Sequence, residues 1–331
     1  MRCPTLNELP PAPQGKTGWP WTEESSSLPD RREDGSPWTR ISVVTPSYNQ
    51  GQFIEETIRS VLLQGYPNLE YIIIDGGSND GSIEIIKKYE RWLDFWISEK
   101  DDGQGDAINK GLERATGPIA NWLNSDDLFY IGALKRVAMA CASDETAILY
   151  NGSALRIDSE GVYGSPFPAC SLLPENVLEG KVALPQPAIF FRRDHWLRHG
   201  KLKRHLYYAI DTDLFVSGIL TGHSRAIKGP PLAMMRVHEA AKTAQAKALK
   251  PMFLERHEIF SNLNRNPNTP EHFQRYIRYG LNREAFRLAR IILRERGQWI
   301  QAILWFIRAL RYSPKKTLHR FPDILLGQFH K

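Results

Sequence analysis

The chain has 331 residues, of which 42% are hydrophobic and 24% charged, and its formal net charge is +6. These ordinary values favour a soluble globular protein with one large domain and an appendage, or with two medium domains. Three cysteines at unrelated spacings argue against a disulfide framework or a zinc site, and the longest apolar run (299–307) is about half of the roughly 18 residues that a membrane-spanning helix needs.

Residues 1–39 are rich in Pro, Ser and Gly and show little periodicity, which predicts an extended amino-terminal arm. Two tryptophans of this arm, Trp19 and Trp21, are expected to pack on the domain that follows. A role in ligand binding is the alternative.

From residue 41 to residue 140, short β-branched runs alternate with amphipathic segments four times. This alternation predicts βαβ units that build a parallel sheet buried on both faces. The expected strands are 41–45, 69–74, 93–98 and 118–124, and the expected helices are 53–63, 83–92, 105–115 and 131–140.

The pattern is less regular between residues 147 and 238, where short strand-like and helical pieces alternate. We interpret this part as a continuation of the same domain with mixed strands. The predicted domains are therefore an arm (1–39), an α/β domain (40–240) and a helical extension (241–331).

Polar clusters follow the four predicted strands: TPSYNQG, DGGSNDGS, SEKDDGQGD and NSDD. Because ligands bind at the carboxyl ends of parallel strands, we expect these clusters to converge at one edge of the sheet. No G-x-G-x-x-G, Walker-type or EF-hand pattern is present, which disfavours those phosphate and calcium sites.

Three acids in these clusters are candidates for ligand binding. Asp75 stands at the end of a strand, where it either shapes the glycine-rich turn or accepts a hydrogen bond from a nucleobase or a ribose. Asp126 and Asp127 follow a hydrophobic strand in tandem. They either cap the next helix or hold a hard divalent cation, Mg²⁺ or Mn²⁺, together with substrate phosphates.

In their order and spacing, VVTPSYNQG, IIDGGSNDGS, SEKDDGQGDAINKG and WLNSDD resemble the inverting family 2 glycosyltransferases, of the type that builds bacterial cell-surface polysaccharides. The resemblance covers roughly residues 40–240. It implies the α/β GT-A fold of nucleotide-diphospho-sugar transferases, with a mixed, mostly parallel sheet flanked by helices and followed here by a helical extension. It also implies inverting transfer from a nucleotide-diphosphate sugar, with a UDP-sugar favoured.

The resemblance assigns roles to residues of the first motifs and of the acidic motif. Pro46 and Tyr48 would line the pocket for the base and ribose, and Asp75 would accept from the base. Asp126 would lean toward the ribose and Asp127 would hold the cation. The sequence departs from a strict D-x-D here, because Asn124 and Ser125 precede the two acids, so we expect one carboxylate to dominate metal binding.

Further roles follow from the same resemblance. Asn109 is the best candidate for contact with the donor sugar, ahead of Asp101 and Gln104. In YYAIDTDLFVSG, Asp211 matches the position of the general base, although it and Asp213 could simply begin a helix. His238 matches a position near the metal or the diphosphate, although a lone His is more often structural.

The tail carries the basic character of the chain, because residues 271–331 contain 13 Lys and Arg against 4 Asp and Glu. Two amphipathic helices are expected, one in the segment from about Pro270 that includes the apolar positions 281–292, and one at about 298–311, with Pro314 ending the second. Either they lie on an anionic membrane or they dock on the catalytic domain. Nucleic-acid binding is disfavoured because the arginine stripe lacks stacking aromatics.

The sequence thus predicts a cytoplasmic glycosyltransferase, or one peripheral on the inner face of the membrane, with a glycan or lipid-linked acceptor. A glycosyltransferase-like scaffold without activity is the alternative from another class. Such a scaffold is expected to have lost an acid, yet all four candidate acids are present, namely Asp75, Asp126, Asp127 and Asp211.

Overall fold

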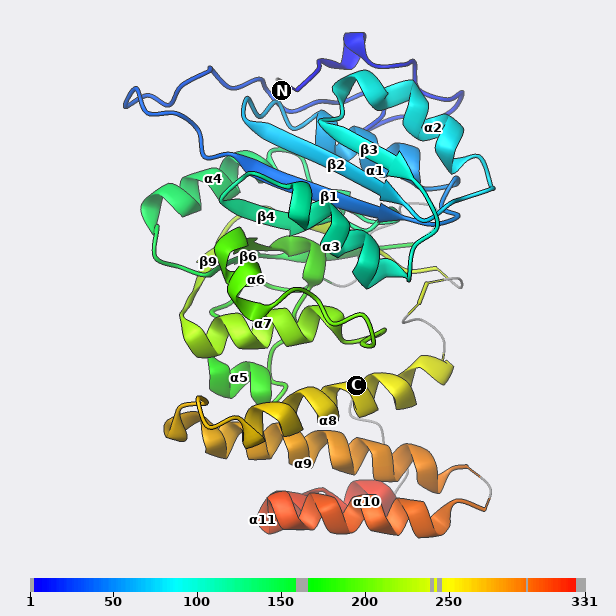
Figure 1. Cartoon of the computed structure of the whole chain (residues 1–331), viewed down its shortest axis with the longest axis vertical. Helices are drawn as coiled ribbons and strands as arrows, with labels where there is room; N and C mark the ends of the chain where they lie inside the picture. The colour runs from blue at the N-terminus through cyan, green and yellow to red at the C-terminus, as the bar shows by residue number, and fades with distance from the viewer. Residues whose placement is uncertain (1–2, 159–165, 239–240, 243–245, 296, 326–331) are drawn as a thin grey trace. The chain divides into compact units, whose positions relative to one another are not determined.

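Two compact units make up the structure, a computed structural model that describes all residues except 1–2, 159–165, 239–240, 243–245, 296 and 326–331. Figure 1 follows the chain by colour. The sheet unit comprises Met1–Leu172, Leu184–His205 and Thr221–His238, and the helical unit comprises Leu173–Ala183, Leu206–Leu220 and Glu239–Lys331.

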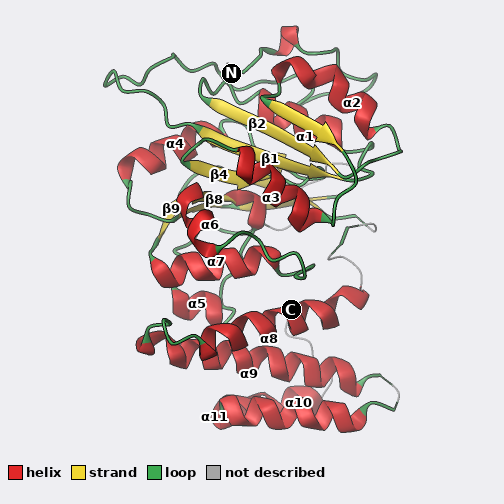
Figure 2. Ribbon diagram, in the orientation of Figure 1, coloured by secondary structure: helices red, strands yellow, loops and turns green. Residues whose placement is uncertain are grey.

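A seven-stranded sheet forms the centre of the sheet unit, in the order β3-β2-β1-β4-β8-β6-β9 (Figure 2). The four strands from β3 to β4 run parallel, whereas β8 runs antiparallel to both of its neighbours. The strands are β1 (Ile41–Ser47), β2 (Leu69–Asp75), β3 (Phe95–Ser98), β4 (Ile119–Trp122), β6 (Leu149–Gly152), β8 (Ile189–Arg192) and β9 (Ser224–Ile227).

The strand register aligns the carboxyl ends of the parallel strands. Ser47 of β1 lies opposite Asp75 of β2, and Asp75 lies opposite Ser98 of β3. The loops that follow these three strands therefore leave the sheet along one edge, as the sequence predicts.

Helices cover both faces of the parallel strands, which is why every residue of β1 and β2 is buried. Side chains alternate along β1: Val43 joins a core with Ile58 of α1, whereas Val44 faces Gly111 of α3. The helices of this part are α1 (Ile54–Leu62), α2 (Ser82–Tyr89), α3 (Gln104–Arg114) and α4 (Ala133–Ser143).

A second, three-stranded sheet lies in the same unit, in the order β5-β10-β7. Its strands are β5 (Leu128–Phe129), β7 (Ala154–Ile157) and β10 (Ala233–Arg236). Because β10 pairs with β5, the end of β10 lies next to the acidic turn that precedes β5. A further helix of this unit is α6 (Arg193–His199).

The amino-terminal arm packs on the sheet unit through its tryptophans, as predicted. Trp19 donates its indole N–H to the carbonyl of Phe129 over 2.9 Å, and Trp21 is buried beneath the guanidinium of Arg59. Arg59 is itself buried and donates to three carbonyls of the arm, those of Pro10, Pro20 and Trp21.

The helical unit is built around α9 (Glu271–Leu293), which packs against both α8 (Leu249–Arg265) and α10 (Trp299–Tyr312) (Figure 2). Asn282 of α9 is fully buried and donates to the carbonyl of Ala309 and to the hydroxyl of Thr317. It thereby links α9 to α10 and to α11 (Pro314–Leu325). The unit also contains α5 (Pro174–Leu178) and α7 (Ile210–Thr221, which ends at the boundary of the unit).

The predicted alternation of strands and helices over residues 41–140 is confirmed. Both predicted tail helices are present, and Pro314 ends the second as expected. Pro314 also begins α11, because proline fits the first turn of a helix. Helices α8 and α11 lie within the predicted helical extension, although no separate range was predicted for either. None of the described helices is long and apolar enough to cross a membrane. The predicted domain boundaries after residues 39 and 240 stay predictions.

The close contact between α3 and β1 is testable. A Cβ atom at Gly111 would lie 2.3 Å from Cγ1 of Val44, so Gly111→Ala forces the helix away from the sheet. We expect a loss of about 1–3 kcal/mol in the free energy of unfolding, measured in urea. Val44→Ala removes the clashing methyls, so the double variant should lose clearly less stability than the two single variants summed. Simple additivity would contradict the contact.

Candidate functional site

Asp75 ends β2 and is fully buried. Its carboxylate accepts hydrogen bonds from the backbone N–H groups of Gly77 (3.1 Å) and Ser78 (2.9 Å) and from the hydroxyls of Ser78 (2.6 Å) and Ser98 (2.7 Å). Asp75 therefore shapes the glycine-rich turn, which is one of the two roles inferred from the sequence. Its contact with a nucleobase stays a prediction.

The loop after β1 is joined to the loop after β2. The backbone N–H of Asn49 donates to the Ser78 hydroxyl (2.8 Å), and that of Gly51 donates to the Asp80 carboxylate (2.8 Å). Pro46 is buried within β1, whereas Tyr48 is 61% exposed at the mouth of this loop. An exposed aromatic ring beside fixed loops is suited to contact with a planar base.

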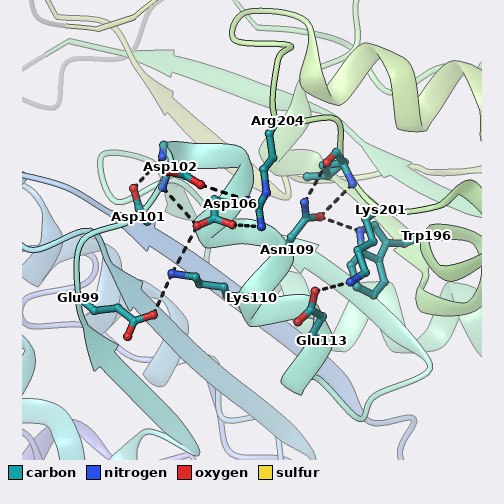
Figure 3. Close-up of polar contacts among 12 residues, drawn as sticks. Glu99, Asp101, Asp102, Asp106, Asn109, Lys110, Glu113, Trp196, Lys201 and Arg204 are labelled. Carbon is teal, nitrogen blue, oxygen red and sulfur yellow. Dashed lines mark hydrogen bonds and ion pairs between the residues drawn. The ribbon is translucent and has the colours of Figure 1, made fainter.

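The loop after β3 approaches the same place and leads into α3. The Asp101 carboxylate accepts from the backbone of Gly103 (2.8 Å), and a Cβ atom at Gly76 would lie 2.8 Å from an Asp101 oxygen. Burial raises the pKa of Asp101. The neighbouring Asp106 forms ion pairs with Lys110 (3.4 Å) and Arg204 (2.7 Å), as Figure 3 shows.

Asn109 lies further along α3 and is buried (Figure 3). Its amide donates to the carbonyl of Leu202 (2.9 Å) and accepts from the backbone N–H of the same residue (2.9 Å) and from the Trp196 indole (3.3 Å). Asn109 thus holds the segment after α6 against α3. Its contact with a donor sugar stays a prediction.

The acidic turn after β4 is held by donors from several elements. Asp127 is buried, and its two oxygens accept from the backbone N–H of Arg236 (2.9 Å) and from the Asn124 amide (3.2 Å). Gln104, at the start of α3, donates in turn to Asn124 (2.8 Å). Burial and the adjacent charge of Asp126 raise the pKa of Asp127 well above the usual range.

Arg236, at the end of β10, also donates a hydrogen bond to this turn from its side chain. Its side chain is 2% exposed, and Nε donates to the carbonyl of Asp126 (3.0 Å). Nη2 forms an ion pair with Glu56 of α1 (2.8 Å), and the guanidinium lies over the Phe53 ring at 4.9 Å. Arg236 therefore fixes the turn through its backbone and its side chain together.

His238 lies two residues beyond Arg236 and pairs with the other acid. Its Nε2 is 3.1 Å from Oδ2 of Asp126, and its ring contacts Phe53 at 4.8 Å between centroids. The structure thus places His238 beside Asp126, the more exposed member of the acidic pair. Neither acid of the pair begins a helix, because the next element is the short strand β5.

A divalent cation fits this turn in a particular way. The described residues contain no group of three or more His, Cys, Asp and Glu side chains arranged to hold a metal ion. However, Mg²⁺ and Mn²⁺ are often held by one or two carboxylates, with substrate phosphates and water as the other ligands. Asp126 and Asp127 are adjacent carboxylates, and burial together with the charge of Asp126 raises the pKa of Asp127. A bound cation would stabilise the charged forms of both carboxylates.

Asp211 belongs to the helical unit, in the first turn of α7. Its carboxylate accepts from the backbone N–H of Thr212 (2.6 Å). Burial raises the pKa of this carboxyl, and the charge of Arg256 on α8 opposes that shift. A carboxyl with a raised pKa is suited to proton abstraction. Its proximity to the acids of the sheet unit stays a prediction.

The segment before Asp211 is held by α8, a feature that the sequence analysis does not predict. The Glu255 carboxylate accepts from three successive backbone N–H groups, those of Tyr207 (2.9 Å), Tyr208 (2.7 Å) and Ala209 (2.8 Å). Lys242 lies over the Tyr207 ring at 3.5 Å, and burial lowers its pKa to about 8. These contacts fix the start of α7 within the helical unit.

The structure therefore connects four of the predicted residues, Gln104, Asp126, Asp127 and His238, and adds others. Hydrogen bonds connect Gln104, Asn124 and Asp127, while Arg236 and His238 contact the acidic turn from β10 and the segment after it. Arg236 and Glu56 are absent from the predicted site. Neither residue could be predicted, because no sequence pattern indicates that Glu56 of a helix contacts Arg236 of a strand 180 positions later.

Comparison with known proteins identifies relatives of this chain. The family described as Glycosyl transferase family 2 matches residues 42–206, about half of the chain. A putative teichuronic acid biosynthesis glycosyltransferase, TuaG, of Bacillus subtilis is 38% identical over 119 residues, which are 35% of this chain and 47% of the relative. An uncharacterized glycosyltransferase of Rickettsia typhi is 27% identical over 232 residues, or 62% of this chain and 66% of the relative. The chain thus spans less than two thirds of the length of these relatives.

Solved structures share the fold over most of the chain. The S. aureus protein TarS 1-349, in complex with UDP-GlcNAc, has a TM-score of 0.64 at 18% identity and covers 88% of this chain and 93% of its own. The mannosyltransferase PcManGT from Pyrobaculum calidifontis, in complex with GDP-Man and Mn²⁺, has a TM-score of 0.53 at 20% identity, covering 92% and 89%. The fold is therefore the predicted GT-A fold.

The ion pair beneath the acidic turn provides a test of how the turn is held. Glu56→Gln leaves the buried guanidinium of Arg236 without its ionic partner. We expect a loss of about 1–3 kcal/mol in the free energy of unfolding, measured in urea. The exposed Glu84 on α2 is the control. Glu84→Gln should cost less than about 1 kcal/mol, and equal losses in the two variants would contradict the assignment.

Proposed function

The chain belongs to glycosyltransferase family 2, and we propose that it transfers a sugar from a nucleotide-diphosphate sugar to an acceptor hydroxyl with inversion at the anomeric carbon. One observation carries the proposal. The loops after β1, β2, β3 and β4 leave one edge of the sheet, and hydrogen bonds join them in pairs around Asp75 and Asp127. Ligands of open α/β sheets bind at such an edge.

The donor would lie along this edge. We assign its base and ribose to Pro46, Tyr48 and Asp75, with Asp126 toward the ribose, and the donor sugar to Asp101, Gln104 and Asn109. The exposed ring of Tyr48 is compatible with a stacking contact to the base, beside the turn that Asp75 fixes. A UDP-sugar is favoured because TarS, which shares the fold, is described with UDP-GlcNAc.

Asp127 and His238, with Asp126 between them, would hold Mg²⁺ or Mn²⁺. Two observations support this assignment: PcManGT is described in complex with Mn²⁺, and Asp126 and Asp127 are adjacent acids in the turn. Such an ion supplies Lewis-acid stabilisation of the charge that develops on the departing diphosphate. The residues of the chain position this turn: Arg236 and Asn124 fix Asp127, and His238 pairs with Asp126.

Asp211 would act as the general base. Its carboxylate would remove the proton of the acceptor hydroxyl while that oxygen attacks the anomeric carbon from the face opposite the diphosphate. The bond from the anomeric carbon to the diphosphate oxygen breaks in the same displacement, so the configuration is inverted. No covalent enzyme intermediate is needed, and the proton remains on Asp211 until solvent removes it.

We assign the acceptor to the glycan or lipid-linked class, in cell-surface polysaccharide synthesis. The support is the similarity to the putative teichuronic acid glycosyltransferase. A cytoplasmic site of action, or one at the inner face of the membrane, agrees with three cysteines that are all free thiols. A glycosyltransferase-like scaffold without activity is the alternative, and the variants below separate the two.

Asp127→Asn tests the acidic turn while keeping the shape of the side chain. We expect Mn²⁺-dependent binding of a UDP-sugar, measured by calorimetry, to weaken at least about 100-fold, because the variant removes a carboxylate from the cation site. The exposed Asp194 of α6, which lies outside the four strand-end loops, supplies the control: Asp194→Asn should bind within about threefold of the wild type. Unchanged binding by a folded Asp127→Asn protein would overturn the metal assignment.

Asp211→Asn tests the base. Donor affinity should stay within about threefold of the wild type, whereas turnover should fall about 10²–10⁴-fold. In the wild type, turnover should decline as the pH falls through a pKa above the ordinary aspartate value, because burial raises the pKa of Asp211 and the base acts deprotonated. A variant with normal turnover would remove Asp211 from the mechanism. A wild type that binds donors yet transfers no sugar to any acceptor would favour the scaffold.

A further inference from the structure

Helix α10 of the helical unit has one face that is packed and one that is not. Ala302 and Ala309 are buried, and they pack with Ala285, Leu288 and other residues of α9. This packed face accounts for the attachment of α10 to its neighbour. It leaves open why the rest of the helix is also apolar.

The opposite face of α10 exposes five large apolar side chains, from Ile307 at 40% to Trp299 at 59%. Their positions recur at helical spacing, so they form one continuous stripe. Single exposed apolar residues are normal on protein surfaces, but five on one side of a helix mark a contact surface. We call this stripe the apolar face of α10: Trp299, Ile300, Ile303, Leu304 and Ile307.

The charged residues of α10 itself are all positive. Arg308 and Arg311 of α10 are exposed, and Arg308 is held over the Trp305 ring at 4.5 Å. Lys315, at the start of α11, is also exposed. In the sequence, no acid occurs between Glu295 and Asp323. An apolar stripe on a helix whose own charges are basic is complementary to the surface of an anionic membrane, which is apolar inside and negatively charged outside.

We propose that the apolar face of α10 docks on an anionic lipid surface, with the helix lying in the plane of the membrane interface. At 14 residues, α10 is too short to span a bilayer, which needs about 20. Helices with an apolar face, a basic border and a Trp at the boundary bind in this way. The packing of α10 on α9 leaves the apolar face available for this contact.

A second copy of the chain is a poorer occupant of this face. In a symmetric dimer, the same surface of each subunit meets its counterpart. Two copies of α10 would then bring four arginines, Arg308 and Arg311 from each, and no acid of that helix into the contact. Like charges in that position oppose association, whereas anionic headgroups offset them. The inference stands apart from the proposed transfer reaction, because it concerns binding alone.

The test uses the full chain and vesicles of two compositions, pure phosphatidylcholine and a mixture with phosphatidylglycerol. We expect cosedimentation with the anionic vesicles only, and weaker binding at high salt. Ile303→Ser combined with Ile307→Ser should reduce vesicle binding at least about tenfold. Arg308→Gln combined with Arg311→Gln should reduce it about tenfold and flatten its salt dependence.

Leu197 of α6 is the matched control, since it is an apolar residue of the sheet unit that is 52% exposed. Leu197→Ser should bind vesicles within about twofold of the wild type. Circular dichroism checks that the Ile303/Ile307 variant is folded. Absence of binding to anionic vesicles, or equal binding by this variant, would overturn the proposal. A dimer in sedimentation equilibrium that this variant dissociates, without vesicle binding, would instead make the face a contact between copies.

Discussion

A buried carboxylate needs fixed donors, and in this protein those donors come from β10 and from the loop after β4. The backbone N–H of Arg236 and the amide of Asn124 satisfy Asp127, while the guanidinium of Arg236 binds the carbonyl of Asp126. Burying an acid without such partners is costly. The acidic turn is therefore stable only where β10 pairs with β5, which explains why the small sheet accompanies the large one.

Burial and hydrogen bonding also distinguish the residues that hold the loops in place from the residues that are exposed to a ligand. Asp75 and Asn109 are buried, and protein groups hydrogen-bond to their side chains. Tyr48 is exposed, and Asp126 is more open than its neighbour. Motif residues of one site thus divide between building the loops and meeting the substrate, and a sequence motif does not distinguish these two tasks.

Sequence patterns predicted the parallel sheet well because its strands are buried on both faces and its helices are amphipathic. Pairings between distant segments left no comparable signal. The contact of Arg236 with Glu56 joins a helix to a strand 180 residues away, and Glu255 binds the backbone of Tyr208 from another helix. Helix α8 lies within the predicted helical extension, but its range was not predicted, because its apolar residues recur less regularly than those of α9.

The helical unit shows a second way of holding buried charge. Glu284 of α9 is fully buried, and its carboxylate lies within 2.7 Å of Arg283 and 3.5 Å of Arg287. Nearby guanidinium groups lower the pKa of Glu284, although burial alone would raise it. Arg283 is buried as well, so part of the positive charge of α9 faces the interior of the helical unit. Exposed positive charge beside the apolar face comes from Arg308 and Arg311 of α10.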